Sequence, residues 1–234
     1  SSHPAIAELA RSVAESGKRA ALSSIMSQRV TPELATSLSE SEYKTVALAP
    51  EAGSEALRFR VGKRVCDEQI VSAVATLARE GIRHFKLYFM VGLPSETLED
   101  VAHIPELVER AREAAMAAAR EQEDFRIAPT IFLSVNPFIP KAWTPFQRHP
   151  FLGLREAKRR IEIVQHAVRR MPNVDMKFES PRESYFQALM SRGDRRVGDL
   201  LIKMHQEKND WRWIVRHGDE ELLEGVPPVD FYVL

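Results

Sequence analysis

The sequence has 234 residues, of which 44% are hydrophobic, and this can fill the core of one large domain or two small ones. Lys plus Arg and Asp plus Glu number 33 each, so no overall charge indicates a nucleic acid or an anionic membrane as partner. The single cysteine, Cys66, excludes an internal disulfide framework and any zinc or iron–sulfur site built from several thiolates of this chain.

The sequence carries no targeting or metal-binding pattern. No apolar run approaches the ~20 residues that a membrane-spanning helix needs, and the chain does not open with a signal-peptide pattern. The seven histidines are not spaced like metal ligands. We therefore expect a soluble, cytoplasmic protein with no membrane partner, no specific nucleic-acid signal and no metal site of its own.

Helical periodicity and strand-like apolar runs alternate along most of the chain. In order, the pattern predicts a helix over residues 4–16, a strand over 20–25, a helix over 33–39, a strand over 45–49, a helix over 67–80, a strand over 84–91, a helix over 98–121, a strand over 130–135, a helix over 154–170 and a strand over 174–178. The strands read as apolar on both faces. This combination predicts parallel βα units whose sheet is covered by helices.

The two ends of the chain depart from this pattern. A helix precedes the first predicted strand, which suggests that an N-terminal piece of the βα array is missing. From Arg182 the chain contains helical patches over 184–190 and 197–204, and its end, 226–234, reads as extended. We expect an α/β domain over 1–171 and an α-rich C-terminal extension over 172–234.

Polar or Gly/Pro-containing loops follow the predicted strands, and in parallel α/β folds that edge of the sheet is where sites are built. Glu51 follows one strand and is suited to hydroxyl recognition, although an exposed loop acid is the alternative. Gly92-Leu93-Pro94 ends another strand and is either a tight turn or a place where a flat ligand approaches the backbone. Asn136-Pro137 ends a third strand, again as a ligand-facing backbone or an ordinary turn.

Three motifs together resemble a known family. They are TVALAPEAGSEALRFRVGK (45–63), HFKLYFMVGLPSETLEDV (84–101) and IFLSVNPFIPKAWTPFQ (131–147). In this order they resemble the second half of a radical S-adenosylmethionine (radical SAM) domain, over about residues 3 to 150. The tail ESPRESYFQALMSRGDRRVGDLL (179–201) is similar to the C-terminal region of the uncharacterised radical SAM branch with an upstream cobalamin-binding domain.

The resemblance implies a partial (βα)6 barrel of the TIM type that binds S-adenosylmethionine across its strand ends. It implies that Glu51 contacts the ribose and that Lys63 binds the carboxylate of S-adenosylmethionine. The strand end Met90, Val91, Gly92 and Leu93 would lie beside the adenine, and the backbone at Asn136 would contact it. Of the basic residues Arg58, Arg60, Lys63 and Arg64, most are expected to be solvated, and one could reach an anionic ligand group.

One departure from the family is severe. The family holds a [4Fe-4S] cluster through three cysteines, Cys-x3-Cys-x2-Cys, whereas this chain has one cysteine in a different place. Four of the predicted strands would be the third to sixth of the barrel, with the first two absent, and the fifth, over 174–178, would lie in the tail. We therefore expect a fragment of a radical SAM enzyme, inactive alone and without an identified catalytic residue. Its full-length parent would bind the cluster and, by the branch resemblance, cobalamin.

Two other readings remain open at this point. The chain could be a barrel-like binding or scaffold module without a cluster, or a small-molecule enzyme that uses Glu51 or Glu96 as general base. The substrate is not identified by the sequence. A sheet that lacks two strands leaves an edge exposed, so self-association through the 20–25 strand is also expected.

Overall fold

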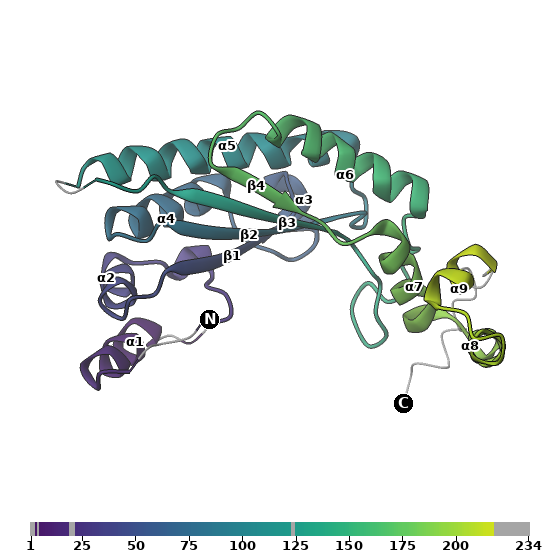
Figure 1. Ribbon diagram of the computed structural model, residues 1–234. Coiled ribbons are helices and arrows are strands. Elements are labelled where there is room, and N and C mark those ends of the chain that lie inside the picture. The colour runs from purple at the N-terminus through teal and green to yellow at the C-terminus, as the bar shows by residue number, and fades with distance from the viewer. Residues whose placement is uncertain (1–2, 4, 19–21, 123–124, 218–234) are drawn as a thin grey trace. The chain divides into compact units, whose positions relative to one another are not determined.

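A computed structural model describes residues 3, 5–18, 22–122 and 125–217 of the chain (Figure 1). Helices and strands alternate as expected for βα units. In chain order they are α1 (Ile6–Glu15), the 3-10 helix η1 (Ser27–Arg29), α2 (Pro32–Glu40), β1 (Thr45–Glu51), α3 (Glu55–Arg60), α4 (Asp67–Arg79), β2 (His84–Val91), α5 (Leu98–Arg120), β3 (Thr130–Pro137), α6 (Leu154–Val168), β4 (Val174–Lys177), α7 (Pro181–Arg192), α8 (Arg195–Gln206) and α9 (Trp211–His217). The extended segment predicted over 226–234 lies outside the described residues.

The chain divides into two compact units. Unit 1 comprises residues 1–89, 95–135 and 162–177, and unit 2 comprises residues 90–94, 136–161 and 178–234. The elements β2, β3 and α6 pass from one unit into the other. The domain boundary expected between residues 171 and 172 stays a prediction.

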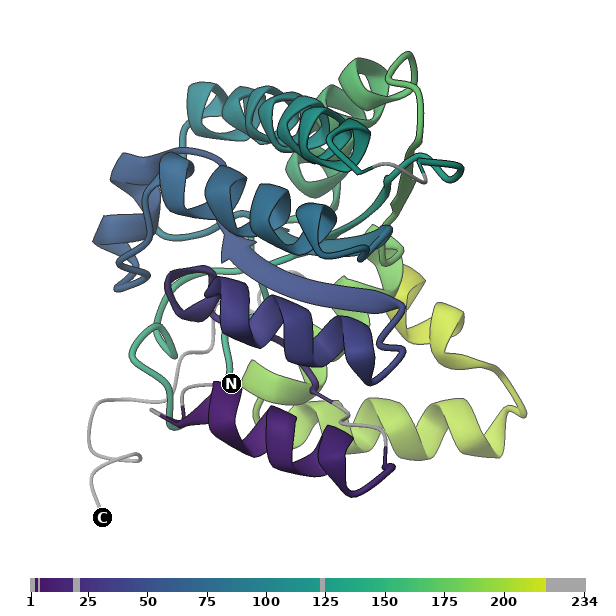
Figure 2. The same ribbon diagram turned by 90° about the vertical axis from the view of Figure 1, so that its left-hand side faces the viewer.

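A single four-stranded sheet, in the order β1-β2-β3-β4, organises the described residues. β1 and β2 pair in parallel with Val46 opposite Phe85, and β3 and β4 pair in parallel with Ile131 opposite Val174. The helices α4 and α5 pack against each other, and Figure 2 shows α1, α2, α4 and α5 in succession as a row of helices. This architecture confirms the predicted α/β class and is consistent with a partial barrel of the TIM type.

Burial alternates in β2 and β3, so the expectation that the strands are apolar on both faces was wrong for these two strands, whereas β1 has three consecutive buried residues, Val46 to Leu48. In β2 the side chains of Phe85, Leu87 and Phe89 are buried, whereas Lys86 is exposed and Tyr88 is 37% exposed. Successive side chains of a strand point to opposite faces, so one face of β2 belongs to the core and the other does not. In the sequence HFKLYF, Lys86 and Tyr88 alternate with the buried residues, which is a pattern of period two.

The strand predicted over 20–25 was also wrong over its described part. Ile25 forms an isolated parallel bridge to Leu48, with its N–H donating to the Ala47 carbonyl at 2.9 Å. The Leu22 N–H instead donates to the hydroxyl of Tyr43 at 3.1 Å, and that hydroxyl donates back to the Leu22 carbonyl. A side chain therefore satisfies backbone groups that a β-ladder would otherwise use. Residues 20 and 21 lie outside the described residues.

The helix starts follow the expected capping chemistry. The Leu34 N–H donates to Thr31 Oγ1 at 3.2 Å, with Pro32 in the first turn of α2. At the start of α5, the Asp100 N–H donates to Thr97 Oγ1 and the Thr97 N–H donates to Asp100 Oδ2, which is a capping box. Cys66 directly precedes α4 and is its N-cap residue.

Unit 2 contains its own small core, and its helices confirm the expected α-rich tail. Its buried residues come from the segment before α6, from α7 and from α9: they are Phe151, Tyr185, Ala188, Leu189 and Ile214. The rings of Phe151 and Tyr185 meet edge to face at 6.2 Å between centroids. Trp213 also packs against this core.

Candidate functional site

Glu51 ends β1 in an unusual backbone conformation. Its φ is +75°, in the left-handed region that residues with a Cβ rarely adopt. The register between β1 and β2 shifts between Leu48 and Glu51, so the strand is irregular where Glu51 leaves it. Strained residues of this kind persist only where their surroundings hold them, and they cluster at functional sites. The structure therefore singles out Glu51 at the C-terminal end of β1, two residues beyond the predicted strand end.

Glu51 is paired with Lys63, the other polar residue that the sequence assigned to this site. Lys63 Nζ lies 3.2 Å from Glu51 Oε1, and the two side chains are 33% and 30% exposed. Lys63 lies in the turn after α3, where Gly62 has a φ of +82°. Twelve residues apart in the sequence, the carboxylate and the ammonium group thus form one half-exposed charged pair in unit 1.

The loop that follows Glu51 is fixed to the start of α5. A Cβ on Gly53 would lie 2.1 Å from the carbonyl oxygen of Asp100, so the two backbones approach too closely for any side chain there. The Ser54 hydroxyl donates to the Asp100 carboxylate and also accepts from the Leu57 N–H, which caps α3. The loop after β1 is therefore held against α5 by backbone contact and by a side-chain hydrogen bond.

Asp100 is the centre of this attachment. Its carboxylate accepts from Ser54, from the N–H and hydroxyl of Thr97, and from Arg60 at 3.3 Å. Burial alone would raise the pKa of Asp100, but the hydrogen bonds from Ser54 and Thr97 and the charge of Arg60 outweigh it and hold the pKa below its usual value.

Arg58 departs most clearly from the sequence-based expectation. Most of the basic residues in this segment were expected to be solvated, but Arg58 is fully buried. Arg58 Nε donates to the Val65 carbonyl at 2.9 Å, and Nη1 donates to the carbonyls of Ala52 and Gly53. Its Nη2 forms an ion pair with Asp67. No sequence signal indicates this role, because the short helix α3 that carries Arg58 was itself not predicted.

The Gly-Leu-Pro turn lies in unit 2 and is closely packed by protein. Gly92 has a φ of +88°, and a Cβ there would lie 2.9 Å from Leu152 Cδ2. Val91 and Leu93 are buried, at 0% and 3% exposure, and Met90 is partly exposed. Leu152 thus fills the space that the missing side chain leaves. The adenine contact assigned to this strand end stays a prediction.

His149 is a neighbour of this turn that the sequence did not single out. Its ring is hydrogen-bonded to the backbone of Gly92, and its carbonyl accepts from Arg192. Desolvation by the surrounding protein and the nearby charge of Arg192 lower the pKa of His149 below its usual value, although the bond to Gly92 opposes them.

Asn136, the remaining predicted site residue, also lies in unit 2. Its side-chain oxygen accepts from the backbone N–H of Glu179 at 2.9 Å. The Glu179 carboxylate in turn accepts from Gln187 and, at 3.4 Å, from the hydroxyl of Ser184. The side chain of Asn136 therefore connects the end of β3 to the start of α7. A role of its backbone in adenine binding stays a prediction.

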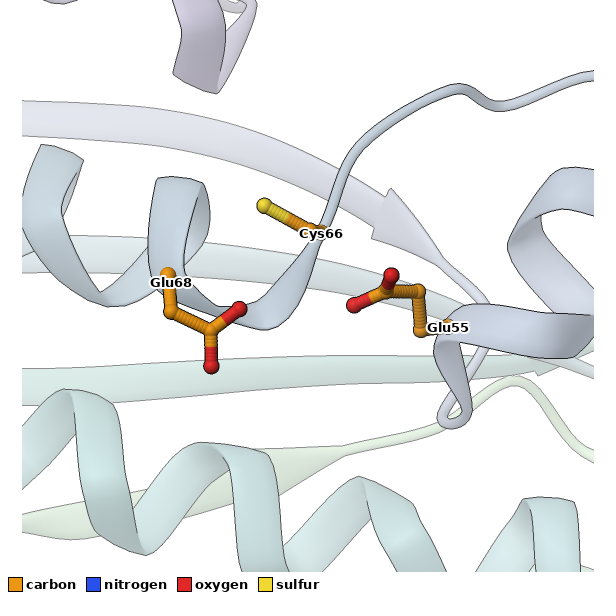
Figure 3. A group of neighbouring side chains, drawn as sticks. All are labelled: Glu55, Cys66 and Glu68. Atoms are coloured by element: carbon orange, nitrogen blue, oxygen red, sulfur yellow. The ribbon is translucent and has the colours of Figure 1, made fainter.

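Three potential metal ligands meet at the start of α4 (Figure 3). The ligand atoms of Glu55, Cys66 and Glu68 all lie within 4.8 Å of one another. Both carboxylates already have partners, because Glu55 accepts from the Asp67 N–H at 3.3 Å and Glu68 accepts from Arg110 at 3.0 Å. These contacts suit the positive end of a helix, and we assign no metal to the group.

The sequence of this chain is similar to known proteins over much of its length. Residues 1–108 match the family model described as the radical SAM superfamily. Over 158 residues the chain is 31% identical to an uncharacterized protein of Methanocaldococcus jannaschii, a match that covers 68% of this chain and 32% of that protein. The chain thus spans about a third of the length of this curated relative.

The matched region contains the charged pair Glu51–Lys63 and the Gly-Leu-Pro turn, but not Asn136. The parallel α/β sheet is consistent with a partial radical SAM barrel, and proteins of that superfamily bind S-adenosylmethionine and a [4Fe-4S] cluster. In the described part of the chain, no helix combines the length and the apolar character needed to span a membrane.

Proposed function

We propose that this chain is part of a radical SAM enzyme and contributes two polar ligands of S-adenosylmethionine. In this proposal Glu51 accepts hydrogen bonds from the ribose hydroxyls, and Lys63 binds the carboxylate of the methionine moiety. Met90, Val91, Gly92 and Leu93 line the adenine, and the backbone at Asn136 contacts it. The observation that carries the proposal is the half-exposed Glu51–Lys63 pair at the end of β1, within the region that matches the superfamily.

The chemistry of this pair fits the ligand. A carboxylate is an acceptor that can take two ribose hydroxyl donors, and an ammonium group is suited to a carboxylate. The two side chains are about one-third exposed, so a ligand can reach both without unfolding the loop. S-adenosylmethionine carries its hydroxyls and its carboxylate on one molecule and could therefore engage both partners of the pair.

The residues of this chain cannot bind the [4Fe-4S] cluster through three cysteines. A three-cysteine [4Fe-4S] site needs three thiolates, and the chain contains Cys66 alone. In this proposal the cluster cysteines belong to another part of a longer protein, of which the chain is a fragment. We predict that this chain, treated anaerobically with iron and sulfide, stays essentially colourless. A stoichiometric [4Fe-4S] absorbance band would contradict this assignment.

We also propose that the chain belongs to a longer parent protein. The chain spans about a third of its archaeal relative, which supports a longer parent. A cobalamin-binding domain upstream, and radical chemistry on a substrate still to be identified, rest on the resemblance of the quoted motifs alone. A cytoplasmic location is part of the same proposal.

The direct test is calorimetric titration of the full-length protein with S-adenosylmethionine. Loss of a hydrogen bond to a charged group typically costs on the order of 1.5–3 kcal/mol, so Glu51→Gln and Lys63→Met should each weaken binding by about ten- to a hundredfold. Both side chains are about one-third exposed, so the melting temperature should change little.

Two matched substitutions serve as controls. Glu40→Gln and Lys44→Met make the same chemical changes at exposed positions of unit 1 outside the proposed site, and they should leave the affinity unchanged. If the wild-type protein does not bind S-adenosylmethionine, the proposal fails and a cluster-free binding module becomes the better account. If it binds and Glu51→Gln binds equally well, Glu51 is not a ligand.

A further inference from the structure

Arg58 is a fully buried cation whose hydrogen-bond partners come from two separate segments. Its Nη1 donates to the carbonyls of Ala52 at 3.1 Å and Gly53 at 2.8 Å, directly after Glu51. Its Nε donates to the carbonyl of Val65 at 2.9 Å, two residues after Lys63. The guanidinium group therefore joins the chain next to one partner of the charged pair to the chain next to the other.

A buried charge is tolerated only when it is paired and hydrogen-bonded, and Arg58 meets both conditions. Asp67 supplies the countercharge through an ion pair with Nη2. The planar guanidinium group directs several donors at fixed angles, which lets one side chain hold three carbonyls and a carboxylate. The ammonium group of a lysine is a compact point charge and cannot reproduce this geometry.

The backbone of Lys63 is held by the same residue. The Lys63 N–H donates to the Arg58 carbonyl at 2.8 Å, and the Val65 N–H donates to the Lys63 carbonyl at 2.8 Å. Lys63 thus lies between the main chain of Arg58 and the residue that Arg58 binds with its side chain. A movement of Arg58 would shift the base of the Lys63 side chain.

The pair needs such support, because its own attraction is weak. Half-exposed ion pairs contribute little and do not fix two side chains by themselves. Glu51 is also held in a left-handed backbone conformation, which persists only where the surroundings impose it. Among the described contacts of this loop, the bonds of Arg58 to Ala52 and Gly53 supply that constraint directly after Glu51.

We propose that Arg58 is the positioning residue of the Glu51–Lys63 pair: it does not touch the ligand, but holds the two ligand-binding side chains at their mutual distance. Because the pair is taken as a binding site, this inference rests on the proposed function. Arg58 is then a buried residue of that site and keeps the two side chains in place before the ligand binds.

The first measurement needs no ligand. In the full-length protein, amide hydrogen exchange is compared between wild type, Arg58→Lys and Arg60→Lys. Arg60 lies two residues away in α3, is 48% exposed and makes one bond, at 3.3 Å, to Asp100, so it receives the same substitution without the same role. Arg58→Lys should speed exchange of the Lys63 and Val65 amides by about tenfold or more, and Arg60→Lys should leave them unchanged.

The second measurement is the affinity for S-adenosylmethionine. Arg58→Lys should weaken binding by about tenfold, and Arg60→Lys by less than about twofold. If Arg58 acts through Lys63, then adding Arg58→Lys to Lys63→Met should weaken binding clearly less than the product of the two single effects. A residue that only stabilises the fold would instead give multiplicative effects.

Each outcome decides between the two proposals. If wild type does not bind S-adenosylmethionine, the proposed function fails, while the exchange data still show whether Arg58 holds the loop. Unchanged exchange at Lys63 and Val65, unchanged affinity, or fully multiplicative effects in Arg58→Lys would overturn the positioning role.

A second variant covers the case in which Arg58→Lys does not fold. Asp67→Asn retains an oxygen acceptor for Arg58 but removes its countercharge, and it should change exchange and affinity in the same direction by a smaller factor. Asp67 also pairs with Arg110 at 2.7 Å, so Arg110→Gln, which should have no effect at Lys63, is its control. Wild-type exchange in Asp67→Asn would contradict the proposal.

Discussion

Asp100 shows how a single residue connects the loop of the candidate site to the rest of the fold. It lies in the first turn of α5, where negative charge is favoured, and it accepts hydrogen bonds from Ser54 and Thr97. These contacts lower its pKa, so the ionised carboxylate stabilises the folded state. Loss of that charge should therefore lower the free energy of unfolding.

We predict that Asp100→Asn lowers the free energy of unfolding at pH 7 by about 1–3 kcal/mol. A lowered folded-state pKa stabilises the fold above the ordinary value of 3.8 and loses this contribution as the pH falls through the lowered value. The difference between variant and wild type should hence shrink in acid. Urea denaturation across a pH series measures it, with Glu99→Gln, an exposed carboxylate of the same turn, as control. A difference that stays constant in acid would contradict this account.

The sequence, through its resemblance to a family, could predict part of the candidate site. Glu51 and Lys63 were assigned from the sequence through the family resemblance, and the structure brings them to 3.2 Å. Arg58 could not be assigned, because an arginine among charged neighbours has the same pattern whether it is buried or solvated. What decides its burial is the pair of loop segments around it, and their approach is a tertiary property.

At the scale of elements, the loop after β1 and the helix α5 form one tightly packed unit. Gly53 lies so close to α5 that a Cβ would meet the Asp100 carbonyl at 2.1 Å and Ile104 Cγ1 at 2.8 Å. Backbone atoms cannot move aside as the end of a flexible side chain can. The glycine is therefore required by the approach of helix and loop.

A pair of glycine substitutions tests this packing, with opposite expected signs. Gly53→Ala should lower the free energy of unfolding by about 1–3 kcal/mol or more, because it overpacks a backbone contact. Gly198→Ala, in the helix α8 with nothing within 4 Å of its Cβ position, should raise it by about 0.5–1 kcal/mol. Thermal and urea denaturation of both variants would show it. A neutral Gly53→Ala would mean that loop and helix lie further apart.

The helices and strands with long periodic patterns were predicted well. The prediction was less accurate where a side chain, and not another strand, bonds the backbone. The sequence pattern located α4, α5, β2 and β3 to within a few residues. It failed over residues 22–25, because the Tyr43 hydroxyl takes the backbone groups of Leu22, and no local pattern reveals a contact across 21 residues. It also missed α3, which at six residues is too short for a periodic signal.

At the scale of the whole molecule, the described sheet has an outer strand with little pairing. On the side of β1 away from β2, the pairing found among the described residues is the bridge from Ile25 to Leu48. Edge strands with free backbone groups tend to pair with another chain. Self-association through this edge is a proposal that follows from the sheet order.

Light scattering of this chain over a range of concentrations tests the association. We predict a mass above that of the 26.6 kDa monomer that rises with concentration, since the pairing described at this edge of β1 is one bridge at Ile25. The proposed longer protein, if further strands cover this edge, is the matched comparison and should associate less. A strictly monomeric chain at all concentrations would contradict the proposal.

The central claim is that Glu51 and Lys63 bind two different parts of S-adenosylmethionine, and comparison of two ligands tests it most directly. Calorimetry would measure the affinities of the full-length wild type, Glu51→Gln and Lys63→Met for S-adenosylmethionine and for 5′-methylthioadenosine, which keeps the ribose and adenine but lacks the carboxylate. Glu51→Gln should weaken both ligands by about tenfold or more, whereas Lys63→Met should weaken only S-adenosylmethionine. Unchanged affinities in Glu51→Gln, or an equal loss for both ligands in Lys63→Met, would contradict the claim.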